Sequence, residues 1–168
     1  FAILTAKPLR QFRYLADPEG KGEAAGYARP DHDDKGWKTT DVCVETWSSL
    51  GLHDYFKSVW YRASVALPAI PAGKTVRLWV GGTDGRVKVF VNGHHVPYVA
   101  TVERPDKTRA LEVREAAEGY CQPFSFDITA AVQPGATNQI ALLCTRTFLN
   151  ELGTGGLLAP VVIYRERD

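Results

Sequence analysis

The chain has 168 residues, of which 45% are hydrophobic and 23% are charged. This length suffices for one sizeable hydrophobic core, so we expect a single domain over residues 1–168. The net charge of +1 argues against nucleic acid as a partner, and the lack of a long apolar run or an apolar N-terminal leader argues against a membrane span and an intact signal peptide.

The first half of the chain holds several stretches in which apolar and polar residues alternate with the period of a half-buried strand. These stretches are residues 11–15, 42–44, 59–67 and 74–80. Between them, residues 17–38 predict a long polar loop rich in Gly, Pro and Asp, with Trp37 as its apolar anchor. Residues 47–57 predict an aromatic-rich loop, and residues 81–85 a glycine-rich connection.

The second half opens on the clearest local signal, a β-hairpin around Asn92-Gly93. Residues 87–91 alternate strictly, and the Asn-Gly pair suits a type I′ turn because both central residues need positive φ. The charged segment 98–122 has the weakest strand pattern, and residues 111–118 predict one or two helical turns. Alternation returns in three further stretches, which are residues 124–129, 138–145 and 161–164.

The three cysteines are Cys43, Cys121 and Cys144, an odd number without metal-ligand spacing. Cys144 shares the alternation of Ile140 and Leu142, which predicts a buried thiol that behaves as a small hydrophobic side chain. One disulfide remains the alternative, so the cysteines do not decide the redox compartment.

About eight or nine short strands separated by turn signals predict an antiparallel β-sandwich or jelly roll. If neighbouring strands alternate in direction, the loops before residue 59, between 80 and 86, between 98 and 124, and after 145 lie at one end. The turns at Pro68, Asn92 and Pro134 then lie at the other end.

Several short motifs follow one another in a recognisable order. They are Val59-Trp60-Tyr61-Arg62, Val76-Arg-Leu-Trp-Val-Gly-Gly, Val89-Phe-Val-Asn-Gly and Phe126-Asp-Ile-Thr. In order and spacing they resemble the galactose-binding-like jelly-roll domain, in particular the sugar-binding domain of family 2 glycoside hydrolases and related carbohydrate-binding modules. The resemblance implies an all-β domain excised from a larger secreted enzyme, extracellular or periplasmic, whose catalytic domain is its partner.

The longer loops supply the groups that carbohydrate recognition uses, namely aromatic rings for C–H faces and planar polar groups for hydroxyls. The candidate ligand residues are Trp47, His53, Tyr55, Asp84, Arg86, Tyr120, Arg146 and Asn150. Packing is the alternative for each of them, above all for Trp47 and Tyr120. We therefore predict a non-catalytic carbohydrate-binding module that targets its parent enzyme to a poly- or oligosaccharide. The alternative is a structural accessory domain that packs against the catalytic domain and has no ligand of its own.

Metal binding and catalysis find less support. His94 and His95 are adjacent on a strand and therefore point to opposite faces, so we expect no metal site there. Asp31, Asp33 and Asp34 allow a structural calcium, but their spacing matches no defined loop, and no cofactor is required. Asp84 and Glu151 could supply the two carboxylates of a glycosidase, yet no other catalytic motif accompanies them.

Trp79 and Phe90 lie on the opposite side of their strands from the core residues. With a turn centred near residues 83–84, Trp79 would face Lys88 and Arg77 would face Phe90, which predicts cross-strand cation–π contacts. The alternative is an exposed aromatic platform on the sheet face, which would be a second surface for a glycan.

Overall fold

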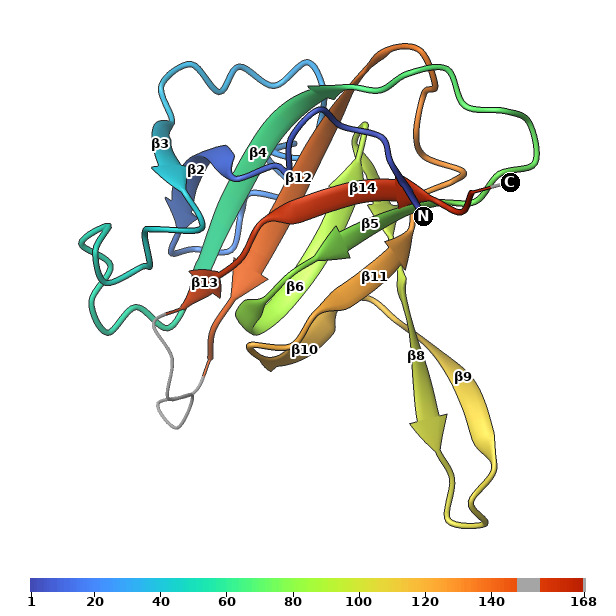
Figure 1. The fold of residues 1–168 in the computed structure, drawn as a ribbon. Coiled ribbons are helices and arrows are strands. Elements are labelled where there is room, and N and C mark those ends of the chain that lie inside the picture. Colours follow the sequence, from blue (N-terminus) through green and yellow to red (C-terminus); the bar gives the residue numbers. More distant parts are fainter. Residues whose placement is uncertain (148–154, 168) are drawn as a thin grey trace.

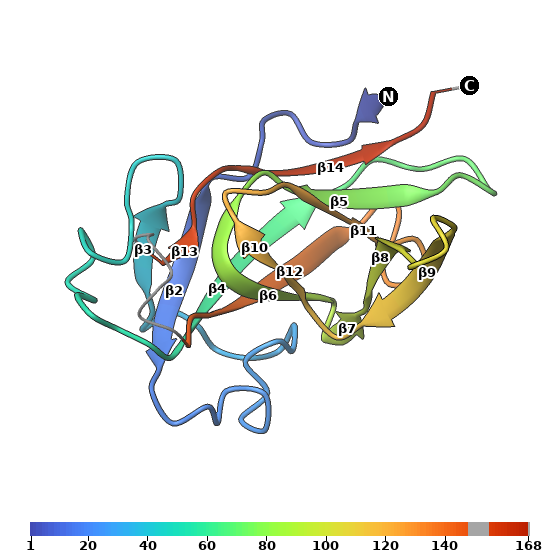
Figure 2. The ribbon, with the colours of Figure 1, turned by 90° about the horizontal axis from the view of Figure 1, so that it is seen from below.

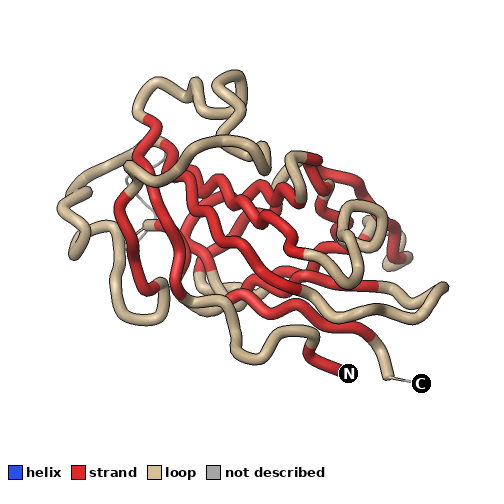
Figure 3. The backbone as a smooth tube through the Cα atoms, turned by 90° about the horizontal axis from the view of Figure 1, so that it is seen from above, coloured by secondary structure: helices blue, strands red, loops and turns tan. Residues whose placement is uncertain are grey.

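Two antiparallel sheets face each other in the computed structural model, which describes residues 1–147 and 155–167 (Figures 1 and 2). The smaller sheet has the strand order β1, β14, β5, β11, with bounds Ala2–Ile3, Val161–Arg165, Val76–Val80 and Phe124–Asp127. All regular structure in the described residues is β-strand (Figure 3), so the expected antiparallel sandwich is confirmed. None of these residues forms a helix long and apolar enough to cross a membrane.

The larger sheet has the strand order β10, β6, β12, β4, β2, β3, and β7 and β13 also pair with β6. In that order the bounds are Ala117–Tyr120, Thr83–Val91, Thr137–Thr145, Ser58–Ala66, Gln11–Asp17 and Lys38–Asp41, with His94–Val96 for β7 and Gly156–Leu157 for β13. A separate hairpin of β8 (Tyr98–Glu103) and β9 (Arg109–Arg114) projects from the sandwich (Figure 1).

The main core lies between the inner faces of the two sheets, where alternate residues of each strand point inward. It includes Leu78 and Ile163 from the smaller sheet and Val89, Leu142 and Cys144 from the larger one, all fully buried. The thiols are free, so Cys144 is the buried thiol that the alternation predicted. Alternation fails as a guide to burial where a second layer covers the outer face, and also at the start of β6, where Thr83, Asp84 and Gly85 are all buried.

That second layer is the long loop between β2 and β3, which covers the outer face of the larger sheet. Trp37 and Ala28 of this loop join Trp60, Phe90 and Leu143 of the sheet in a second buried cluster. The predicted anchoring role of Trp37 is confirmed by its burial. Residues on both sides of β4 are therefore removed from water, including Arg62.

Most of the loops lie at the end of the sandwich that the alternating strand directions predicted for them. Thr145 lies opposite Ser58 on β4 and Arg86 on β6, so the segments before β4, at the start of β6 and after β12 meet at one end. We call this the loop end. At the opposite end, Asn92 and Gly93 have φ of 52° and 84°, which confirms the type I′ hairpin turn.

Two sequence predictions of secondary structure are wrong. Residues 42–44, expected as a strand, form a turn, and β3 ends before them at Asp41. The Asp41 carboxylate and carbonyl accept the N–H groups of Cys43 and Val44 at 3.0 Å each and close this turn. Residues 111–118, expected as helix, instead contain the end of β9 and the start of β10, with Val113 opposite Val99 in the projecting hairpin. Tyr98 anchors that hairpin against the core.

The predicted contacts of Trp79 with Lys88 and of Arg77 with Phe90 are also wrong. The chain crosses from one sheet to the other after β5, so β5 and β6 are not neighbours. Lys88 instead pairs with Glu23 at 2.9 Å, and Phe90 packs against Trp60 under the long loop.

Candidate functional site

Trp47 plugs the loop end of the sandwich. Its indole N–H donates to the Tyr61 hydroxyl at 2.7 Å, and the side chain is buried. Gly155 and Gly156 pass directly over the indole with φ of 77° and 84°, and a Cβ at either position would collide with the ring. The indole therefore stabilises the end of the core and offers almost no surface to a ligand.

Tyr55 packs beside this plug. Its ring meets the edge of Trp47 with centroids 5.5 Å apart, and its hydroxyl donates to the Ser58 carbonyl at 2.9 Å. Burial raises the pKa of Tyr55 to about 12, so the phenol stays neutral at physiological pH. Two of the aromatic side chains expected to contact sugar are thus engaged inside the domain.

Asp84 is fully buried on β6, between Tyr120 on β10 and Gly156 on β13. Its Oδ2 accepts the backbone N–H of Gly155 at 2.8 Å, while Oδ1 has no hydrogen-bond partner among the described residues. The carboxylate ties the returning chain to the start of β6. It is inaccessible to a sugar in this arrangement.

The remaining candidates lie nearer the surface of the loop end. Tyr120 is 54% exposed, and Arg86 is exposed in an ion pair with Glu118 at 3.7 Å. His53 is exposed as well, and the Arg146 guanidinium lies over the Phe56 ring at 4.9 Å. Asn150 and Glu151 lie outside the described residues. The structure brings the candidates to one end but separates them into a packed interior and an exposed rim.

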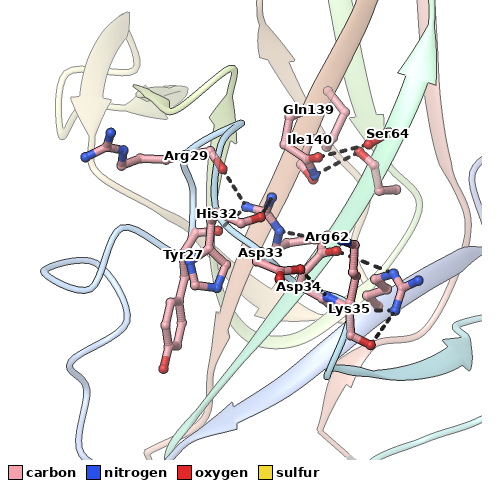
Figure 4. A network of polar contacts seen from close by, with 12 residues as sticks. Tyr27, Arg29, His32, Asp33, Asp34, Lys35, Arg62, Ser64, Gln139 and Ile140 are labelled. Atoms are coloured by element: carbon pink, nitrogen blue, oxygen red, sulfur yellow. Dashed lines mark hydrogen bonds and ion pairs between the residues drawn. The ribbon is translucent and has the colours of Figure 1, made fainter.

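The strongest polar network, which sequence reasoning missed, surrounds Arg62 under the long loop (Figure 4). Its Nε donates to Asp34 Oδ2 at 2.8 Å, and its Nη1 donates to the carbonyls of Tyr27 and Arg29, the latter at 3.1 Å. Its Nη2 donates to the His32 carbonyl at 3.5 Å. The available signal was a charged residue beside Trp60 in a clear strand, together with a long loop that needed a partner. The network fixes this loop onto the sheet.

The loop aspartates considered for calcium have partners within the protein. Asp34 pairs with Arg62, Asp31 pairs with Arg29 at 2.8 Å, and Asp33 accepts the N–H of Lys35 at 3.1 Å. Within residues 1–147 and 155–167, no group of three or more His, Cys, Asp or Glu side chains is arranged to hold a metal ion. Structural calcium stays an untested prediction.

Two exposed apolar surfaces lie outside the loop end. The outward face of the projecting hairpin carries Val99, Leu111 and Val113, the last two 73% and 70% exposed. On the outer face of the smaller sheet, an apolar hollow of about 370 Å³ lies beside Trp79 and Tyr164. These surfaces, and not the loop end, present most of the accessible apolar groups described above.

Comparisons with known proteins support the fold. No protein-family model matches the sequence, and no curated protein matches it. Among solved structures, a β-glucuronidase from Ruminococcus gnavus matches 98% of this chain with a TM-score of 0.72 and 19% identity. A β-glucuronidase from Bacteroides uniformis matches 94% with a TM-score of 0.64 and 18% identity.

The matched part is a minor fraction of each of these proteins. The chain covers 29% of the Ruminococcus gnavus protein and 17% of the Bacteroides uniformis protein. At this level of identity the matches establish a shared fold. The chain therefore has the β-sandwich fold that forms one part of these larger β-glucuronidase chains.

Proposed function

We propose that this chain is an accessory domain of a glycoside hydrolase and that it packs against the catalytic domain of the same protein. The observation that carries the proposal is the coverage, since nearly the whole chain matches less than a third of each β-glucuronidase. A domain of this kind makes interfaces with the rest of its chain. On this proposal the domain is non-catalytic, and hydrolysis of a glucuronide or related glycoside belongs to the whole protein.

The projecting hairpin is the surface that we assign to this packing. Tyr98 at its base lies between Phe124 and Phe126, with ring centroids 5.5 and 5.4 Å away, so the hairpin is tied to the core. Leu111 and Val113 point outward from it and are largely exposed. Adjacent exposed apolar side chains on a soluble domain indicate an interaction surface. Contact with the catalytic domain would remove them from water.

The test separates the 168-residue chain from the remainder of its parent protein and measures their association by analytical ultracentrifugation. Leu111→Asp and Val113→Asp together should weaken association by about tenfold or more, because each places a charge in an apolar contact. Val44→Asp is the matched control, since Val44 is equally exposed in a turn elsewhere. Association that is unchanged by the hairpin variants, or absent in the unmodified pair, contradicts the proposal.

Carbohydrate binding at the loop end is the second candidate, and the exposure of Tyr120 beside Arg86 favours it. Tyr120 would supply a ring for stacking, and Arg86 would supply donors for hydroxyl or carboxylate oxygens. Calorimetry with poly- and oligosaccharides tests this function. Tyr120→Ala should abolish binding without changing the melting temperature, and retention of full affinity by this variant would exclude the loop end as the sugar site.

A further inference from the structure

The outer face of the smaller sheet gathers aromatic and cationic side chains from neighbouring strands. Arg77 on β5 lies opposite Tyr164 on β14, and Trp79 lies opposite Val162. Residues paired in this way project from the same side of an antiparallel sheet. Because Leu78 and the other alternate residues of β5 fill the core, Arg77 and Trp79 belong to the outer side.

Three aromatic rings, two of them from the sheet, border an apolar hollow on this face. The hollow has a volume of about 370 Å³ and is lined by Phe1, Ile3, Trp79, Val162 and Tyr164. The six-membered part of the Trp79 ring lies against Gly81, where a Cβ would collide with it. The Tyr164 hydroxyl is held by a hydrogen bond with Ser125 Oγ at 3.1 Å. Backbone and side-chain contacts therefore fix the Trp79 and Tyr164 rings in place beside an open space.

Arg77 adds hydrogen-bond donors next to these rings. Among the described residues, its guanidinium takes part in no hydrogen bond or ion pair. The nearest carboxylate across the strands, that of Asp127, is used locally, since its Oδ1 accepts the N–H of Thr129 at 3.0 Å and the Thr129 hydroxyl at 2.6 Å. Arg77 is half-buried, and no described residue accepts from its guanidinium donors.

We propose that this face binds an acidic polysaccharide. A pyranose ring stacks on Trp79 and Tyr164, and the Arg77 guanidinium donates to a carboxylate of the same saccharide. Stacking uses the flat apolar rings, and the charge-assisted bond selects a uronic acid over a neutral sugar. The hollow of about 370 Å³ falls in the range of roughly 300–1,000 Å³ of small-ligand sites.

The chemistry of the face matches a uronic acid. The aromatic rings suit the C–H faces of a sugar, and the Arg77 guanidinium on the neighbouring position suits its carboxylate. The face is also distinct from the projecting hairpin and the loop end, so this inference does not depend on either of the functions proposed above.

Tryptophan fluorescence reports on this face directly. The protein has four tryptophans, and Trp37, Trp47 and Trp60 are buried, which leaves Trp79 as the accessible one. Polygalacturonate oligosaccharides should protect the emission of the 168-residue chain from acrylamide quenching in a saturable manner. The affinity for neutral cello-oligosaccharides should be lower by about tenfold or more, because they lack the carboxylate. Equal affinity for the two probes, or no protection by polygalacturonate, overturns the proposal.

Calorimetry on variants locates the site. Trp79→Ala and Arg77→Gln should each weaken polygalacturonate binding by about tenfold or more. Val44→Ala is the control, an exposed apolar residue in the turn after β3, and should bind as the unmodified chain does. If Trp79→Ala fails to fold, Arg77→Gln decides, since no hydrogen bond or ion pair among the described residues depends on the Arg77 side chain. Binding that survives Arg77→Gln, or that is lost in Val44→Ala, refutes the assignment.

Discussion

Replacing Arg62 with alanine tests whether one buried cation holds the long loop on the larger sheet. The Arg62 side chain is 1% exposed, so solvent does not screen its pairing with Asp34. Alanine would leave the Asp34 carboxylate and the carbonyls of Tyr27 and Arg29 without their donor. Removing one partner of a buried ion pair costs about 3–5 kcal/mol of unfolding free energy, and we expect that loss here.

Urea unfolding followed by circular dichroism measures this loss, and thermal unfolding should show a decrease of about 6–20 °C for a chain of this size. Arg13→Ala is the matched control, because Arg13 also pairs with Asp34 but is 41% exposed. An exposed pair contributes about 1 kcal/mol or less, so this variant should remain close to the unmodified chain. Equal stabilities of the two variants would refute the view that Arg62 holds the loop.

Three further changes address the plug and the buried thiol. Tyr61→Phe leaves the Trp47 N–H buried without its acceptor and should cost about 1–3 kcal/mol in urea unfolding. Gly156→Ala should cost about 2–5 kcal/mol, from positive φ and collision with Trp47, whereas Gly20→Ala, which meets no atom within 4 Å, should cost only about 1–2 kcal/mol. Burial raises the pKa of Cys144 from 9.0 to about 12, so the folded state holds this proton more tightly than the unfolded state. The contribution of this thiol to the unfolding free energy is fully present below pH 9 and is lost as pH rises toward 12. Cys144→Ala should therefore flatten the dependence of melting temperature on pH between about pH 9 and 10.

The sequence predicted those strands whose burial follows simple alternation. β5 and β11 are buried at every second position by apolar residues, and the Asn92-Gly93 turn has the chemistry that its φ angles require. β9 was missed because five of its six residues are exposed, so no buried face marks it as a strand. Alternation of apolar and polar residues identifies a strand that has one buried face. It does not identify a strand of a projecting hairpin, because both faces of such a strand are exposed.

The candidate site was harder to predict because residue type does not reveal which way a loop side chain turns. Trp47 and Tyr120 both have the chemistry for stacking on sugar, yet one is inside the core and the other is at the surface. The difference arises from Gly155 and Gly156, distant in sequence, which cover the Trp47 indole. Arg62 was missed for a similar reason, since its partners come from a loop about thirty residues away.

The chain crosses between the sheets after β5. This crossing explains both why Trp79 does not contact Lys88 and why the proposed glycan surface is open. Had β5 and β6 formed a hairpin, Lys88 would lie beside Trp79 and cover part of its ring. The crossing places β14 and β11 beside β5 instead, so Trp79 gains Val162 and Ser125 as neighbours. Short side chains at those two positions leave the ring open on the outer face, and the same crossing leaves Arg77 without an aromatic partner on β6. Accessibility of both groups is therefore a consequence of sheet topology.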